Sequence, residues 1–210
     1  MDSAHQAPTH IADASKMESE QMKRLGVMTL GAALLLASPA FAAEDTEALA
    51  AEARGAVKAF FGNLKGTLVK GLKSGGPAVG VQVCSAAAKG IARNASRQYG
   101  GEVGRTSLKV RNPENAPDAW EHLVLQSFDA RLAKGEDPKK MEHYEILNDG
   151  KTFRYMKAIP TAEKPCLMCH GEKISPEVQK ILAEKYPDDK AVGYKAGQIR
   201  GAFTLQKALQ

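Results

Sequence analysis

The sequence has few cysteines, no long run of basic residues and no internal repeat. Of its 210 residues only three are cysteines; Cys166 and Cys169 stand close together, and Cys84 is left over. The formal charge is +5, but no run of lysine or arginine exceeds two residues. This pattern indicates a solvated basic surface and not a nucleic-acid interface. No nucleophile–base pair is recognisable around the two neighbouring cysteines, so the sequence does not favour an enzyme.

The cysteine pair belongs to the motif Cys166-Leu167-Met168-Cys169-His170, which has the spacing C-x-x-C-H. This spacing is used to attach a c-type haem. Two thiols two residues apart can add across the two vinyl groups of one porphyrin. The next residue is then held close to the iron, where a neutral imidazole is a good ligand. The motif therefore predicts one covalent haem c, attached through Cys166 and Cys169, with His170 as the proximal iron ligand.

Three other uses of the motif remain open from the residues alone. A redox dithiol of the thioredoxin type usually opens a helix within a βαβ unit, and the sequence shows no such unit. A zinc site needs four ligands in a tetrahedron, which the adjacent Cys169 and His170 would close poorly. A structural disulfide between the two cysteines would leave the histidine unexplained.

The N-terminal part has the features of a secretory leader. An extended polar stretch is followed by Lys23-Arg24, a short apolar run over residues 25–37, and Ala40 and Ala42 in an A-x-A cleavage pattern. An uncleaved membrane anchor is the alternative, but the apolar run is short for a span of ~20 residues. We therefore expect a signal peptide over residues 1–42 and a single periplasmic, bacterial domain over residues 43–210, with no membrane span after cleavage. Covalent haem attachment in bacteria occurs outside the cytoplasmic membrane, so leader and motif support each other.

Hydrophobic periodicity predicts a pair of helices at the start of the mature chain. Apolar residues recur every three or four positions over residues 46–72 and 77–99, and Ser74-Gly75-Gly76-Pro77 interrupts the pattern. The short break predicts that the two helices are antiparallel. Cys84 falls on the apolar face of the second helix.

The remainder of the chain reads as strands mixed with helices. Alternating apolar residues predict a strand over residues 103–110 with Leu108 and Val110 on its apolar face, and Asn148-Asp149-Gly150 predicts a hairpin turn. A helix over about residues 118–133 is expected to direct Leu123 inward. The other expected elements are strands over 141–147, 151–159 and 198–205 and a helix over 176–186. This order predicts an α+β fold around an antiparallel sheet.

Four stretches of the mature chain resemble the c-type-haem PAS-like proteins. In chain order they are Val83-Cys84-Ser85; residues 104–113 with Asn115, Pro117, Trp120 and Glu121; residues 166–171; and Gly193-Tyr194 with Gly197 and residues 199–203. Their order and spacing are specific, and they extend over essentially the whole mature chain. The resemblance implies a PAS-like antiparallel sheet with a helical N-terminal extension and one covalently bound haem.

The resemblance also implies which residue is the second iron ligand. In that family the cysteine of the V-C-S stretch lies opposite the histidine of the haem motif, which makes Cys84 the distal thiolate ligand. From the residues alone, Cys84 also reads as a small buried hydrophobe on a helix face. The competing distal candidates are His122, His143, Met141, Met156 and Met168.

Arginines and aromatic residues beside the strands are candidates for further haem contacts. Arg105 and Arg111, and with less specific placement Arg154 and Arg200, can bind the two propionates because arginine pairs with carboxylates in a bidentate way. The residues that either wall a haem pocket or belong to the ordinary core are Trp120, Tyr144, Phe153, Tyr155 and Phe203.

Two functional hypotheses follow. In a redox or gas sensor, reduction or thiol protonation weakens the bond from Cys84 to iron, NO or CO takes the free position, and a redox or signalling protein receives the change. The alternative is a small periplasmic electron-transfer cytochrome. Ordinary soluble c cytochromes have the motif near the N-terminus and a methionine ligand after it, whereas no methionine follows His170 here. The strand signals also oppose the four-helix type. We therefore expect an exported haem sensor.

Overall fold

The computed structural model describes residues 39–209, with side chains from residue 46 onward. The leader expected over residues 1–42 lies outside this range, apart from residues 39–42, which begin the first helix. Within the described range, no helix combines the length and the apolar character needed to cross a bilayer.

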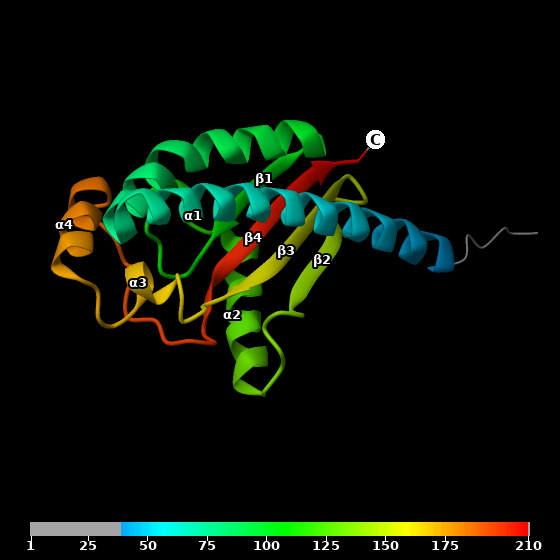
Figure 1. The fold of residues 1–210 in the computed structure, drawn as a ribbon. Coiled ribbons are helices and arrows are strands. Elements are labelled where there is room, and N and C mark those ends of the chain that lie inside the picture. Colours follow the sequence, from blue (N-terminus) through cyan, green and yellow to red (C-terminus); the bar gives the residue numbers. More distant parts are fainter. Residues whose placement is uncertain (1–38, 210) are drawn as a thin grey trace, which may run out of the picture. The chain divides into compact units, whose positions relative to one another are not determined.

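The described chain is an α+β domain with one four-stranded sheet, as predicted (Figure 1). Its strand order is β1-β4-β3-β2, and every neighbouring pair is antiparallel. The elements are α1 (Pro39–Tyr99), β1 (Glu102–Thr106), the short 3-10 helix η1 (Pro113–Asn115), α2 (Ala119–Ala133), β2 (Glu142–Leu147), β3 (Thr152–Pro160), α3 (Leu167–His170), α4 (Pro176–Lys185) and β4 (Ile199–Ala208).

Helix α1 consists of two arms joined at Gly75 and Gly76, whose backbone angles are not helical. Gly76 has φ +75°, which favours glycine, and Pro77 then starts the second arm. The arms run side by side in Figure 1, and they approach so closely that a Cβ on Gly71 would lie 3.0 Å from the Cα of Gly80. The antiparallel helix pair predicted from the sequence is therefore confirmed. We call residues 39–74 the first arm and residues 77–99 the second arm.

The sheet is covered on both faces, and the alternation of side chains along β3 separates two cores. Phe153 and Tyr155 face α1 and pack with Phe60 of the first arm, whereas Met156 and Ala158 face α2. The aromatic residues Phe153, Tyr155 and Phe203 are members of the α1 core. Figure 1 shows the arms of α1 and helix α2 on opposite sides of the sheet.

Two expectations about side-chain direction are wrong. Strand β1 ends at Thr106, because the hydroxyl of Ser107 lies 2.8 Å from the backbone carbonyl oxygens of both Lys109 and Arg200 and the chain turns there. Leu108 is consequently 39% exposed. Leu123 is 64% exposed, since the buried face of α2 runs through Val124, Leu125 and Phe128.

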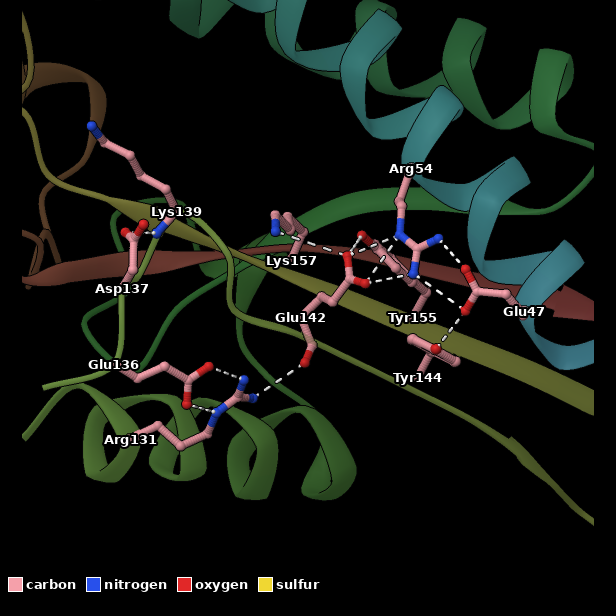
Figure 2. A network of polar contacts seen from close by, with 10 residues as sticks. All are labelled: Glu47, Arg54, Arg131, Glu136, Asp137, Lys139, Glu142, Tyr144, Tyr155 and Lys157. Atoms are coloured by element: carbon pink, nitrogen blue, oxygen red, sulfur yellow. Dashed lines mark hydrogen bonds and ion pairs between the residues drawn. The ribbon is translucent and has the colours of Figure 1, made fainter. Parts of the chain in front are cut away.

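A polar network connects the first arm to the neighbouring strands β2 and β3 (Figure 2). Glu142 of β2 accepts hydrogen bonds from Arg54 at 2.6 and 3.0 Å and from the hydroxyl of Tyr155 at 2.8 Å. Arg54 also binds Glu47 at 2.6 Å, and Glu47 accepts from Tyr144 at 2.7 Å. Each charged group of this network has an opposite charge beside it. We call these five residues the Glu142 network.

Candidate functional site

The motif folds as one short turn of helix, which the sequence analysis did not foresee. Cys166 caps α3, and the backbone N–H of His170 donates to the Cys166 carbonyl at 3.0 Å. Positions three and four residues apart share one side of a helix. The turn therefore places Cys166, Cys169 and His170 on a common side.

Gly171 allows the chain to leave this turn. A Cβ at position 171 would lie 2.6 Å from the carbonyl oxygen of Leu167, far closer than any side chain tolerates. The N–H of Gly193 donates to the Gly171 carbonyl at 3.0 Å, and the N–H of Tyr194 donates to the His170 carbonyl at 2.9 Å. The motif is thus held by backbone hydrogen bonds to the segment that precedes β4.

His170 is held as a neutral imidazole with one defined tautomer. Its Nδ1 lies 2.8 Å from the carbonyl oxygen of Ala191. Since a carbonyl can only accept, Nδ1 carries the proton and Nε2 keeps a free lone pair. Burial, with the charges of Arg200 and Arg111 as further causes, lowers the pKa of His170 to about 2. This side chain is available as a metal ligand through Nε2, in the way that ligating histidines are usually oriented.

Arg111 clamps the motif to the same segment. Its guanidinium forms an ion pair with Asp189 at 2.9 Å, and both side chains are nearly buried. It also donates to the backbone carbonyls of Cys169 and Ala191. Arg111, predicted as a propionate contact, is thus already engaged in holding together the residues around His170.

The structure brings Cys84 from the second arm to the motif. Burial raises the pKa of the Cys84 thiol, and the charge of Arg105 opposes this shift. Burial also raises the pKa of the Cys169 thiol; the charge of Arg111 opposes it, and Cys84 and Cys166 add to it. All three cysteines are free and half-buried. Cys84 thus lies near enough to raise the pKa of the Cys169 thiol, although the two residues are 85 positions apart in the sequence.

Apolar packing supports the same placement. Val81, one turn before Cys84, lies in a buried cluster with Val178 and Leu182 of α4, and Cys169 packs against this cluster. A cavity of about 610 Å³ adjoins this region. It is lined by residues of the second arm including Ser85, by Arg111 and by Tyr186. The site therefore lies between the second arm, α3 and α4.

Two arginines at the site lack an acidic partner. Arg105 of β1 has a pKa lowered by burial, an effect opposed by Cys84 and Tyr186. Arg200 at the start of β4 likewise has a pKa lowered by burial. Within residues 46–209, neither guanidinium forms an ion pair with a carboxylate. Arg154, by contrast, is paired with Asp118 and Glu121 on the α2 face.

The other candidates for a distal ligand lie elsewhere or within the motif itself. Met141 and Met156 are fully buried in the α2 core. His122 is exposed on α2, and His143 contacts Glu145 and the ring of Trp120. Met168 is part of α3. Of the candidates outside the motif, the structure places Cys84 beside it.

Sequence reasoning missed several residues that support the site. Ala191 and Asp189 act through backbone and ion-pair contacts, and Tyr194 packs edge-on to His170 with ring centroids 6.3 Å apart. Only Tyr194 carried a signal in the sequence, since it belongs to a stretch on which the family resemblance rests.

Comparison with known proteins agrees with this fold. No curated protein matches the chain. Among solved structures, the crystal structure of the cyanobacterial haem protein Tll0287 is similar, with a TM-score of 0.56 and 24% sequence identity over 76% of this chain and 96% of that chain. At this identity the similarity shows the fold. The family model described as Tll0287-like matches residues 4–207, which confirms the resemblance found in the four sequence stretches: the chain belongs to the Tll0287-like family.

Proposed function

We propose that this protein binds one haem c covalently and senses a redox change or a diatomic gas in the periplasm. Cys166 and Cys169 would hold the porphyrin, His170 would be the proximal iron ligand, and Cys84 the distal one. The observation that carries the proposal is the state of His170: its Nδ1 is bound to Ala191 and its Nε2 is free, on the same turn as two free thiols.

The residues of the site suit a haem better than a bare metal ion. Within residues 46–209, no three side chains of histidine, cysteine, aspartate or glutamate are arranged to hold a metal ion. A porphyrin supplies four of the iron ligands, so the protein needs to add only two. Arg105, which lacks an acidic partner among the described residues, is suited to the negative charge of a propionate or a thiolate. Arg111 keeps the role of clamp and is a weaker propionate candidate.

Bound haem would supply a one-electron couple and, when reduced, a position for NO or CO. The chain's own contribution would be the control of that position by Cys84. Its Sγ must lose a proton to bind ferric iron, and the charge of Arg105 favours the thiolate. Reduction weakens the preference of iron for a thiolate, so Sγ would leave and take up a proton.

A sensor needs a protein element that responds when the ligand leaves. Cys84 lies on the second arm, which is joined to the first arm at Gly75 and Gly76. The arm therefore begins at a non-helical break, and Cys84 lies seven residues after Pro77. Release of Cys84 would alter the packing of this arm against α4, a change that a partner protein can recognise. The leader expected over residues 1–42 supports a protein that acts after export.

The test is CO binding to the reduced holoprotein, produced with its leader in cells that attach c-type haem. If Cys84 is a displaceable ligand, reduced wild type binds CO, and Cys84→Ala binds it faster because no ligand has to leave. Gln98→Ala, at an exposed position of the same arm outside the site, should behave as wild type. If the reduced wild-type protein does not bind CO but is oxidised and reduced reversibly, the result would favour the electron-transfer cytochrome instead. Mass analysis of the same sample checks cleavage after Ala42.

A further inference from the structure

Arg200 stands directly behind the proposed proximal ligand. Its Nε lies 3.1 Å from Nδ1 of His170. One terminal nitrogen donates to the hydroxyl of Ser107 at 2.8 Å and to the backbone carbonyl of Lys109 at 3.3 Å. The guanidinium is thus fixed by the segment that follows β1, and its position does not depend on His170 alone.

The contact between Arg200 and His170 is one of charge. Nδ1 donates its proton to Ala191 at the shorter distance of 2.8 Å, so it cannot also accept a hydrogen bond from Arg200. A carbonyl that accepts this proton increases the electron density of the imidazole, whereas a cation beside the ring decreases it. Both influences act on the same nitrogen.

The charge of Arg200 is not neutralised by the acidic groups near His170. Asp189 is paired with Arg111, and no carboxylate lies within ion-pair distance of Arg200 in the described part of the chain. Arg200 instead packs against the ring of Tyr194, 5.5 Å from its centroid, and Lys109 also approaches this ring, at 4.8 Å. The proximal side of the site is therefore positively charged.

We propose that Arg200 is a positioning residue that raises the reduction potential of the haem iron through His170. This inference rests on the proposed function, because it needs iron bound at Nε2. On reduction, one electron from a soluble one-electron donor would convert Fe(III) to Fe(II), His170 would keep its bond to the iron, and the released Cys84 thiolate would take up one proton from water. A fixed positive charge disfavours the more positive Fe(III) state. Arg200 would thus oppose the thiolate of Cys84, which lowers the potential.

Redox titration of the holoprotein with dithionite and mediators tests this role. Arg200→Gln removes the charge and should lower the Fe(II)/Fe(III) ratio at a fixed applied potential about tenfold, equivalent to ~59 mV for one electron. Arg200→Lys keeps the charge but loses the forked hydrogen bonds, and it should stay near the wild-type potential. Lys180→Gln, an exposed position on α4 with the same loss of charge, should leave the potential unchanged because surface charges are screened.

The control variants separate charge from structure. If Arg200→Lys lowers the potential as much as Arg200→Gln, or if Arg200→Gln leaves it unchanged, Arg200 does not act through its charge and the inference is overturned. If wild type carries no haem at all, the proposed function fails. In that case ¹⁵N NMR of the apoprotein still decides whether Arg200 acts on His170. Arg200→Gln should shift the imidazole nitrogen resonances of His170 while Lys180→Gln does not, and unchanged resonances in Arg200→Gln would overturn the contact.

Discussion

Two charged regions of this molecule are built in opposite ways. In the Glu142 network, Arg54 binds the carboxylates of Glu47 and Glu142, and each carboxylate also accepts a hydrogen bond from a tyrosine hydroxyl (Figure 2). Around the motif, Arg105 and Arg200 have no carboxylate partner among the described residues, and His170 is neutral.

The difference separates a structural role from a binding role. In a paired network each charge has its partner, and the network connects parts of the fold, here the first arm with strands β2 and β3. Buried cations without a partner are unfavourable unless a ligand brings the opposite charge. The region around the motif therefore has the character of a binding site whose positive charges are balanced only when a negatively charged ligand is bound.

Removal of the two thiols that are proposed to attach haem should give the largest effect, because it tests whether the region around the motif is a binding site. The double variant Cys166→Ala/Cys169→Ala should lose all covalently bound haem, because no thioether can form. A haem-stained denaturing gel and the protein mass measure this loss. Cys84→Ala is the matched control and should retain the covalent haem. Haem that stays attached to the double variant through denaturation would show that the attachment site lies elsewhere.

Substitution of the glycine after the motif should disturb the site less severely. In Gly171→Ala the added Cβ would meet the Leu167 carbonyl at 2.6 Å, so the backbone beside His170 has to move. We expect a loss of ~1–3 kcal/mol in the free energy of unfolding, measured by urea denaturation, together with a changed ferric EPR spectrum. Gly55→Ala is the control, since nothing lies within 4 Å of its Cβ position, which is exposed on the first arm. It should gain up to ~1 kcal/mol. A Gly171→Ala protein as stable as wild type would contradict this tight packing.

Disruption of the Glu142 network should affect stability alone. Glu142→Gln weakens the bonds to Arg54 and Tyr155, and because these groups are partly exposed we expect a loss of only ~1–2 kcal/mol. The reduction potential and the spectra of the haem should stay unchanged. Glu136→Gln, which removes the exposed partner of Arg131, should have a much smaller effect on urea denaturation. A change in the haem spectrum of Glu142→Gln would mean that the two regions are coupled.

The pH dependence of stability tests whether Glu142 is ionised in the Glu142 network. Burial alone would raise the pKa of Glu142, but hydrogen bonds from Arg54 and Tyr155 outweigh it, and the pKa in the folded protein is lowered. A carboxyl with a lowered folded pKa stabilises the fold above its unfolded pKa of about 4.3. This contribution is lost as the pH falls below that value toward the folded pKa. The stability difference between wild type and Glu142→Gln should therefore shrink below about pH 4, and a difference independent of pH would contradict the ionised state.

Local signals in the sequence predicted the elements that depend on local chemistry. Gly75-Gly76-Pro77 marked the turn between the arms, and Asn148-Asp149-Gly150 marked the hairpin, where Asn148 and Asp149 have positive φ. Asp118 and Glu121 form a capping box at the start of α2, close to the predicted boundary. Each of these features is fixed by residues a few positions apart.

Contacts between distant parts of the chain were the ones that pattern reasoning missed. The hydroxyl of Ser107 binds the carbonyl of Arg200, 93 positions away, and this ends β1 before Leu108. Arg111 binds Asp189, and Arg200 approaches His170, without any local pattern that announces either pairing. The motif itself was predictable because its chemistry needs a fixed spacing, whereas its supporting residues come from the tertiary fold.

The proposed axis from Cys84 through iron to His170 is tested most directly by the ferric EPR spectrum of the holoprotein, compared among wild type, Cys84→Ala and Gln98→Ala. Wild type and Gln98→Ala should show a low-spin signal with thiolate character, and Cys84→Ala should lose it while it keeps the covalent haem. An identical low-spin spectrum in Cys84→Ala and wild type would show that Cys84 is not an iron ligand.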